Sequence, residues 1–190
     1  VISVVMGILL TMPTSSAAIW IAIASGSTSD AMMLAGGAAV VGCAAQMVGF
    51  AVMTFKENGV GGLISQGIGT SMLQIPNIMK HPLIFVPPII ASAIVGPIAT
   101  CVFKLRCTAG GGGMGTSGLV GVFGAVEASK GVVSDANIAL GIVFLMFVTV
   151  SYTHLTLPTM FVIPAVVSLL FRILFEKKGW IKGEWMKLDV

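Results

Sequence analysis

The middle of this chain, residues 59–124, alternates long apolar runs with glycine-rich polar stretches. The clearest stretches are GGLISQGIGTSMLQIPNIMKHP at residues 61–82 and TAGGGGMGTSGLVG at residues 108–121. Both place hydroxyl or amide side chains beside backbone that glycine leaves bare and conformationally free. At membrane depth, such backbone is stable only where protein or water satisfies its hydrogen bonds. The pattern therefore predicts glycine-rich broken or re-entrant helices that line a substrate path, rather than helices that face lipid.

Composition supports an integral membrane protein. Hydrophobic residues make up 56% of the 190 residues and charged residues 9%, with a mean hydropathy of +1.05, whereas roughly 25% of residues in soluble domains are charged. A span takes about 20 residues and a separate domain about 50 or more, which leaves little room for a soluble domain. We predict an all-α, polytopic membrane protein with one membrane-embedded domain, residues 1–190. The chain starts inside an apolar run without Met, which indicates N-terminal truncation.

The net charge of +3 comes mainly from the end of the chain. A basic balance that is confined to a tail is not a nucleic-acid footprint, so we expect no nucleic-acid partner. Positive residues mark the cytoplasmic side of membrane proteins, which predicts that residues 176–190 form a cytoplasmic tail. The cations at this end are Arg172, Lys177, Lys178, Lys182 and Lys187.

Apolar runs predict spans at residues 1–24, 31–55 and 82–103, with one or two more within 136–175. The loop at residues 25–30 has no Lys or Arg, so Asp30 is expected outside. Lys104, Arg106 and the tail are expected inside. This assignment requires residues 61–79 to cross the membrane, at least as a broken helix.

The decapeptide VSYTHLTLPT at residues 150–159 interrupts the apolar pattern. It resembles, residue for residue, the translation of a transposon-end sequencing adapter. We interpret residues 150–159 as an assembly artefact and exclude Tyr152 and His154 from the functional argument.

Proline and glycine placement has two interpretations. Prolines that interrupt residues 76–97 predict broken helices, and paired interrupted segments are typical of midplane substrate sites in transporters. Small residues at 67–71 and 111–115 also fit close helix packing, and both interpretations can hold together. The glycine run matches GxGxxG as well, but no βαβ pattern surrounds it and no phosphate-binding Lys follows, which excludes a dinucleotide site.

Several polar side chains are candidates for ligand contacts, each with a structural alternative. Gln66 and Gln74 are eight residues apart, roughly on one helical face, and a carboxamide offers a donor and an acceptor to a polyol. Glu57 could instead pair with Lys56 at the end of a span, and His81 could cap a helix break. Glu127 could be the partner of Lys130, while Gln46 is more typical of a hydrogen bond between helices. The three cysteines, at positions 43, 101 and 107, suit buried packing and predict neither a disulfide frame nor a metal site.

The string GTSMLQIPNI in the first glycine-rich stretch and MGTSGLVG in the second carry a family resemblance. Together with most of residues 32–123 and the tail KKGWIKGEWMKLDV, they resemble the membrane-embedded IIC component of the bacterial sugar phosphotransferase system. The resemblance implies a multi-pass, homodimeric permease in the bacterial plasma membrane. Such a permease binds a sugar from outside and presents it to a separate phosphorylated IIB protein, which IIA serves.

The predicted ligand contacts are Gln74, Asn77, Thr116 and Ser117, with Glu57, His81 and Glu127 as polar anchors. We expect no cofactor, because no Cys or His lies in an activated, solvated loop of the kind a phosphoenzyme needs, and the chemistry would belong to IIB. A transporter-derived sensor or regulator without sugar uptake would need the same fold. An ion-coupled transporter would need a mid-span acid, which the pattern does not show.

Overall fold

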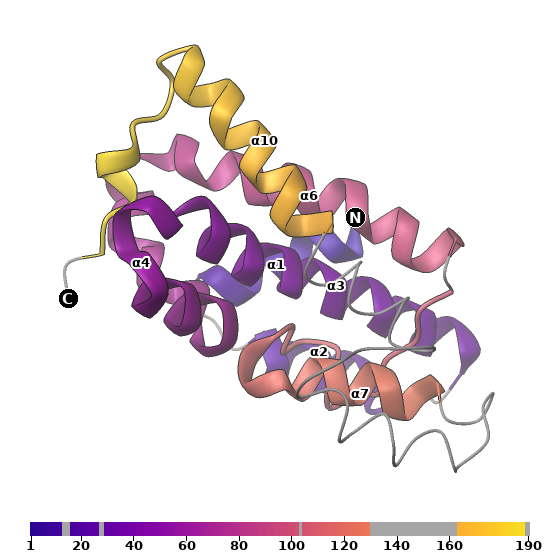
Figure 1. Ribbon diagram of the computed structural model, residues 1–190. Helices are drawn as coiled ribbons and strands as arrows, with labels where there is room; N and C mark the ends of the chain where they lie inside the picture. The colour runs from indigo at the N-terminus through magenta and orange to yellow at the C-terminus, as the bar shows by residue number, and fades with distance from the viewer. Residues whose placement is uncertain (13–15, 27–28, 103, 130–162, 189–190) are drawn as a thin grey trace.

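The structure, a computed structural model, describes residues 1–12, 16–26, 29–102, 104–129 and 163–188 (Figure 1). The regular structure of these residues is helical throughout, which confirms the all-α fold. Two helical runs, α3 and Pro82–Cys101, are long and apolar enough to cross a membrane. The elements are α1 (Ile2–Thr11), α2 (Ser16–Ala24), α3 (Asp30–Met53), α4 (Phe55–Ile64), the π-helix η1 (Ser65–Gly69), the 3₁₀ turn η2 (Ser71–Gln74), α5 (Ile75–Lys80), η3 (Pro82–Phe85), α6 (Val86–Pro97), the π-helix η4 (Ile98–Val102), η5 (Ser117–Leu119), α7 (Val120–Ser129), α10 (Ile163–Lys177) and η8 (Gly183–Met186).

The predicted spans at 31–55 and 82–103 are confirmed as helices of spanning length. The prediction of one span over 1–24 is wrong, because α1 ends at Thr11 and α2 begins at Ser16. Of the last predicted region, residues 163–175 lie in α10. The rest of that region, including the adapter-like decapeptide, lies outside the described residues.

Helix α3 forms the centre of the fold because its side chains are small enough to admit neighbours on every side. All residues from Ala39 to Ala51 are buried. Helices α1, α6 and α10 pack around α3 (Figure 1). At Gly42 the backbone of Ser3 comes so close that any side chain would overlap its carbonyl. A helix that is apolar on all faces is stable only when it is enclosed in this way.

Helices α3 and α6 run antiparallel, so the end of α3 lies beside the start of α6. Phe50, near the end of α3, stacks on Phe85, which precedes α6, with ring centroids 6.1 Å apart. At the opposite end, Arg106 Nη2 lies 2.8 Å from Asp30 Oδ2 at the start of α3. The prediction that Lys104 and Arg106 lie across the membrane from Asp30 is therefore wrong.

The first glycine-rich segment enters the fold and returns at the same end. We call residues 55–80 the first hairpin. Asn58 near its start donates to Met186 O and Asn77 near its end donates to Lys187 O, each at 2.9 Å. Between them the chain turns at Thr70, and Gly67 packs against Ala51 of α3. The segment is therefore re-entrant, which is why residues 61–79 do not cross.

The second glycine-rich segment enters from the other end, and we call residues 105–129 the second hairpin. Cys107 N donates to Met33 O at 3.0 Å, near the start of α3, and Thr108 N donates to Gly124 O at 3.2 Å across the two limbs. Gly115 at its tip lies against the backbone of Cys43 and Ala44. These contacts confirm the predicted broken, re-entrant helices.

The cysteines follow the prediction in part. Cys43 and Cys107 are free and buried, as expected of packing residues. The prediction is wrong for Cys101, which is exposed in η4.

Candidate substrate site

The tips of the two hairpins meet beside α3, and we call this meeting place the junction. Thr116 Oγ1 donates to Gly67 O at 2.6 Å and lies 3.4 Å from Met47 Sδ. Ser117 Oγ donates to Gly69 O at 3.0 Å. Met47 is about three-quarters of the way along α3, which runs from Asp30 to Met53. The junction thus brings two glycine-rich segments from opposite ends together inside the fold.

The end of α1 and the start of α2 also reach the junction. Thr11, the last residue of α1, shares a hydrogen bond of 2.9 Å between its Oγ1 and Ser71 Oγ. Ser16, the first residue of α2, donates to Gly113 O at 2.7 Å. Each hydroxyl keeps acceptor capacity beyond the bond that it donates. Five hydroxyl side chains and several backbone carbonyls therefore converge at the junction.

Gly115 shows why this meeting requires glycine. Its φ of 55° lies in the left-handed region, which costs an L-residue roughly 1–2 kcal/mol. A Cβ there would also lie 2.7 Å from Ala44 N. On the facing hairpin the acceptor carbonyls belong to the π-helix η1, a distortion that is frequent at functional sites.

Four carboxamides of the first hairpin lie between the junction and its entry end. Gln66 Nε2 donates to Thr54 Oγ1, Gln74 Nε2 to Gln66 Oε1, and Asn77 Nδ2 to Gln74 Oε1, each at 2.9 Å. With Asn58 they form what we call the amide cluster. Gln66 and Gln74 lie on opposite limbs of the hairpin, not on one helical face as predicted, and both are fully buried.

The predicted anchors Glu57 and His81 flank the amide cluster, and each has a partner. Glu57 accepts from Arg172 of α10, at 2.6 Å for Oε1 and 2.9 Å for Oε2, so its ion pair forms with Arg172 and not with Lys56. His81 ends α5, consistent with the capping alternative, and stacks on Trp185 with centroids 3.9 Å apart and planes 6° apart.

The third predicted anchor, Glu127, lies apart from the others. It is exposed on α7, in the outward limb of the second hairpin. Within the described part of the chain, no hydrogen bond or ion pair joins Glu127 to the junction or to the amide cluster. The structure thus divides the predicted contacts into two groups and leaves Glu127 apart from both. The junction holds Thr116 and Ser117. The amide cluster and its flanks hold Gln74, Asn77, Glu57 and His81.

Sequence reasoning missed five contributors to these groups and interpreted Gln46 differently. Gln46, fully buried on α3, has no hydrogen-bond partner for either Nε2 or Oε1 among the described residues, so it does not join helices there. The sequence signal that singled out Gln46 was a lone carboxamide in an otherwise apolar span. The other five contributors carried no distinctive signal because their partners are far away in the sequence; they are Thr11, Ser16, Asn58, Ser71 and Arg172.

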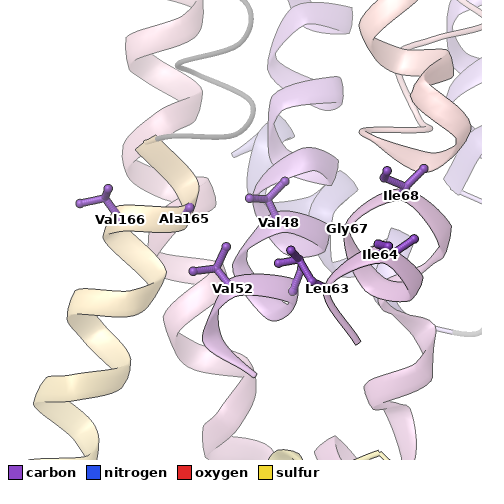
Figure 2. A pocket seen from close by; sticks show the side chains of 9 residues that line it. Val48, Val52, Leu63, Ile64, Gly67, Ile68, Ala165 and Val166 are labelled. Atoms are coloured by element: carbon purple, nitrogen blue, oxygen red, sulfur yellow. The ribbon is translucent and has the colours of Figure 1, made fainter. Parts of the chain in front are cut away.

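An apolar groove lies between the first hairpin, α3 and the start of α10 (Figure 2). Its volume is about 460 Å³, and none of the predicted ligand contacts lines it. Gly67 belongs to both the groove and the junction, because it lines the groove and its carbonyl accepts from Thr116. The groove therefore has the character of a lipid-facing surface. It is lined by Val48, Ala51, Val52, Leu63, Ile64, Gly67, Ile68, Ala165 and Val166.

Within the described residues, two helices of spanning length and two opposed re-entrant hairpins indicate a helical membrane protein, and paired interrupted segments are typical of transporters. The family described as "Phosphotransferase system, EIIC" matches residues 1–188, and the chain belongs to that family. It is thus a bacterial membrane protein and a component of phosphotransferase sugar transport. Searches of curated proteins and of solved structures returned no match.

Proposed function

We propose that this chain is the sugar-translocating IIC permease of a phosphoenolpyruvate-dependent phosphotransferase system. It binds a sugar or polyol at the junction and carries it to the cytoplasmic side. There a separate phosphorylated IIB protein transfers its phosphoryl group to a sugar hydroxyl. The chain supplies binding and access, and IIB supplies the reacting phosphate. Family membership supports the general role, while the sugar and the dependence on IIB belong to the proposal.

The observation that carries this proposal is the convergence of hydroxyls and glycine carbonyls at the junction. The bonds from Thr116 to Gly67 O and from Ser117 to Gly69 O join two segments that enter from opposite ends. A sugar hydroxyl is both donor and acceptor, so it can replace either partner in such a bond. Exchange of these bonds for sugar contacts would separate the tips and couple binding to a change of access.

The side of each end follows from charge. The end that holds the first hairpin carries Lys56, Lys80 and the basic tail, whereas the other end carries Lys104 and the pair of Asp30 with Arg106. The positive-inside rule places the tail end in the cytoplasm, as part of the proposal. Sugar would therefore enter from the side of the second hairpin and leave past the amide cluster. The homodimer predicted from the family resemblance stays a prediction.

Uptake by membrane vesicles tests the proposed function. Vesicles that contain the chain are given a panel of labelled sugars and polyols, with or without phosphorylated IIB. We expect sugar phosphate to accumulate only when IIB is present. Thr116→Ala and Ser117→Ala should each lower kcat/KM by about 10- to 100-fold, because a group that binds a substrate hydroxyl would be lost at a cost of about 1–3 kcal/mol.

Ser25→Ala is the matched control, because Ser25 is an exposed residue whose hydroxyl bonds only locally, to Ala22 O. Its uptake should equal that of the wild type. Sugar binding without IIB-dependent uptake would reject the permease and favour the sensor or regulator. Unchanged uptake in both junction variants would remove Thr116 and Ser117 from the site.

A further inference from the structure

The end of the chain lies across the amide cluster. We call residues 183–188 the strap, and Figure 1 shows it beside α4. Asn58 Nδ2 and Gln74 Nε2 both donate to Met186 O, at 2.9 and 3.1 Å. Asn77 Nδ2 donates to Lys187 O at 2.9 Å, and Leu188 N donates to Asn58 Oδ1 at 2.7 Å. The carboxamides that face this end are therefore satisfied by the strap's backbone.

Side chains of the strap fix it at this position. Met186 is fully buried in a cluster that includes Ile78, Ile84 and Phe85. Trp185 stacks on His81. The strap thus contacts the last turn of the first hairpin and the start of the helical run at Pro82–Cys101 together. It bridges an element that reaches the junction and an element that spans the membrane.

Beneath the strap, polar side chains continue toward the junction. Gln74 bonds to Gln66 and Gln66 bonds to Thr54, and all three are fully buried. Ser71 of the junction lies one turn before Gln74 in η2. A polar ligand that moves from the junction to this end would meet the amide cluster next. The strap occupies the hydrogen-bonding groups that such a ligand needs.

The connection to α10 allows the strap to move as a unit. Helix α10 ends at Lys177, and Gly179 follows with a φ of 71°. A Cβ added at Gly179 would have no described atom within 4 Å. Trp180 and Lys182 are exposed between this glycine and the strap, while Ile181 between them is buried in the same cluster as Met186. Rotation at Gly179 would therefore move Ile181 and the strap together, without a change in α10.

We propose that the strap is a gate at the amide cluster, and that it must leave before sugar can pass between the junction and this end. The gate rests on the proposed function for its role in transport, but its effect on access is independent of any sugar. Docked, the strap takes the place of the ligand on Asn58, Gln74 and Asn77. Released, it frees these three side chains for sugar hydroxyls.

Access to the junction tests the gate without sugar. Ser71→Cys is placed in a chain whose three native cysteines are changed to Ala, and a charged maleimide is added from the tail side. We expect labelling to be at least tenfold faster when residues 183–190 are deleted. Equal labelling rates with and without the strap would overturn the proposal. Co-elution of both proteins on size exclusion confirms that they are folded.

A reversible crosslink provides the second measurement. Asn77→Cys and Lys187→Cys, in the same cysteine-free chain, are joined by a short bis-methanethiosulfonate, which holds the strap on the hairpin. IIB-dependent uptake should fall at least tenfold and return when dithiothreitol cleaves the link. Lys187→Cys alone is the control for the reagent, because the side chain of Lys187 is exposed and only its backbone bonds to the amide cluster. Undiminished uptake by the linked protein would refute the gate. If the wild-type chain takes up no sugar with phosphorylated IIB, the proposed function fails and the labelling of Ser71→Cys still decides the gate.

Discussion

Arg172 binds two carboxylates from a position that is almost closed to solvent. Its guanidinium contacts Glu57 of α4 at 2.6 Å and Glu176 of α10 at 2.9 Å, and its side chain is 6% exposed. Buried ion pairs add little net stability, but removal of one partner leaves a buried charge without compensation. At this scale the residue acts as a link between α10 and the first hairpin.

Arg172→Met should therefore lower the free energy of unfolding by about 3–5 kcal/mol, because Glu57 would keep a buried charge. The double variant Arg172→Met with Glu57→Gln should recover part of this loss. Thermal unfolding in detergent, followed by size exclusion, measures both. Lys177→Met, at an exposed position on the same helix, should unfold like the wild type. Equal loss in the single and double variants would contradict a pairing role.

The cysteines differ in environment, which makes their reactivity informative. Burial raises the pKa of Cys107 to about 12, and the charge of Glu127 adds to this rise, while a backbone hydrogen bond at Thr108 opposes it. A raised pKa keeps the thiol protonated at ordinary pH, and the thiol is much less reactive than the thiolate.

At pH 8.5, N-ethylmaleimide should therefore label Cys101 and leave Cys107 unmodified in the folded protein. The reagent crosses membranes, so labelling depends on burial and not on sidedness. Intact mass before and after denaturation counts the modified thiols, and Cys101→Ala should abolish labelling of the folded chain. Rapid labelling of Cys101→Ala at this pH would show that a buried cysteine is accessible.

At the scale of elements, the second hairpin depends on glycines in unequal ways. Gly115 has a positive φ and packs against the backbone of α3. At Gly110, by contrast, an added Cβ would have no described atom within 4 Å. The same substitution should thus have different effects within one glycine run.

Gly115→Ala should destabilise the fold by about 1–2 kcal/mol through its backbone conformation, with about 1–3 kcal/mol more from overpacking. Gly110→Ala is the matched control and should be close to neutral. Thermal unfolding in detergent compares the two variants. Similar unfolding temperatures would mean that the tip of the second hairpin does not lie against α3.

The sequence predicted the type of these elements better than their partners. Glycine and proline interruptions indicated broken helices, because such residues affect the local backbone wherever they occur. Local pattern could not show that Gln74 bonds to the backbone of Met186, since these residues are 112 positions apart. The same limit applies to Glu57, whose adjacent Lys56 suggested the wrong partner for the ion pair.

At the scale of the whole molecule, the two hairpins enter from opposite ends. The pair Asp30–Arg106 marks one end, and the bonds of Asn58 and Asn77 to the strap mark the other. Hydropathy predicted the two central spans, but charge counting placed Arg106 on the wrong side of Asp30. The error arose because a re-entrant segment and a crossing segment have similar composition, while only the crossing segment moves the next part of the chain to the opposite side of the membrane.

Cysteine accessibility can test this arrangement. In a cysteine-free chain, Gly26→Cys and Arg106→Cys should react with a charged maleimide from the same side of the membrane. Lys178→Cys should react from the opposite side, which is the cytoplasmic side in the proposed orientation. Right-side-out and inside-out vesicles give the two measurements. Reaction of Arg106→Cys from the side of Lys178→Cys would restore a crossing segment between the two central spans.

The strap's bonds to the amide cluster all use its peptide groups, and this has a consequence for how the tail can vary. The three carboxamides contact the carbonyls of Met186 and Lys187 and the amide of Leu188, none of which depends on side-chain identity. Substitutions at Lys187 and Leu188 should be tolerated as long as the backbone keeps its donors, and proline at position 188 should not. The tail is thus constrained mainly at its few anchoring side chains. Its exposed positions can acquire new charges while its backbone contacts with the amide cluster stay the same.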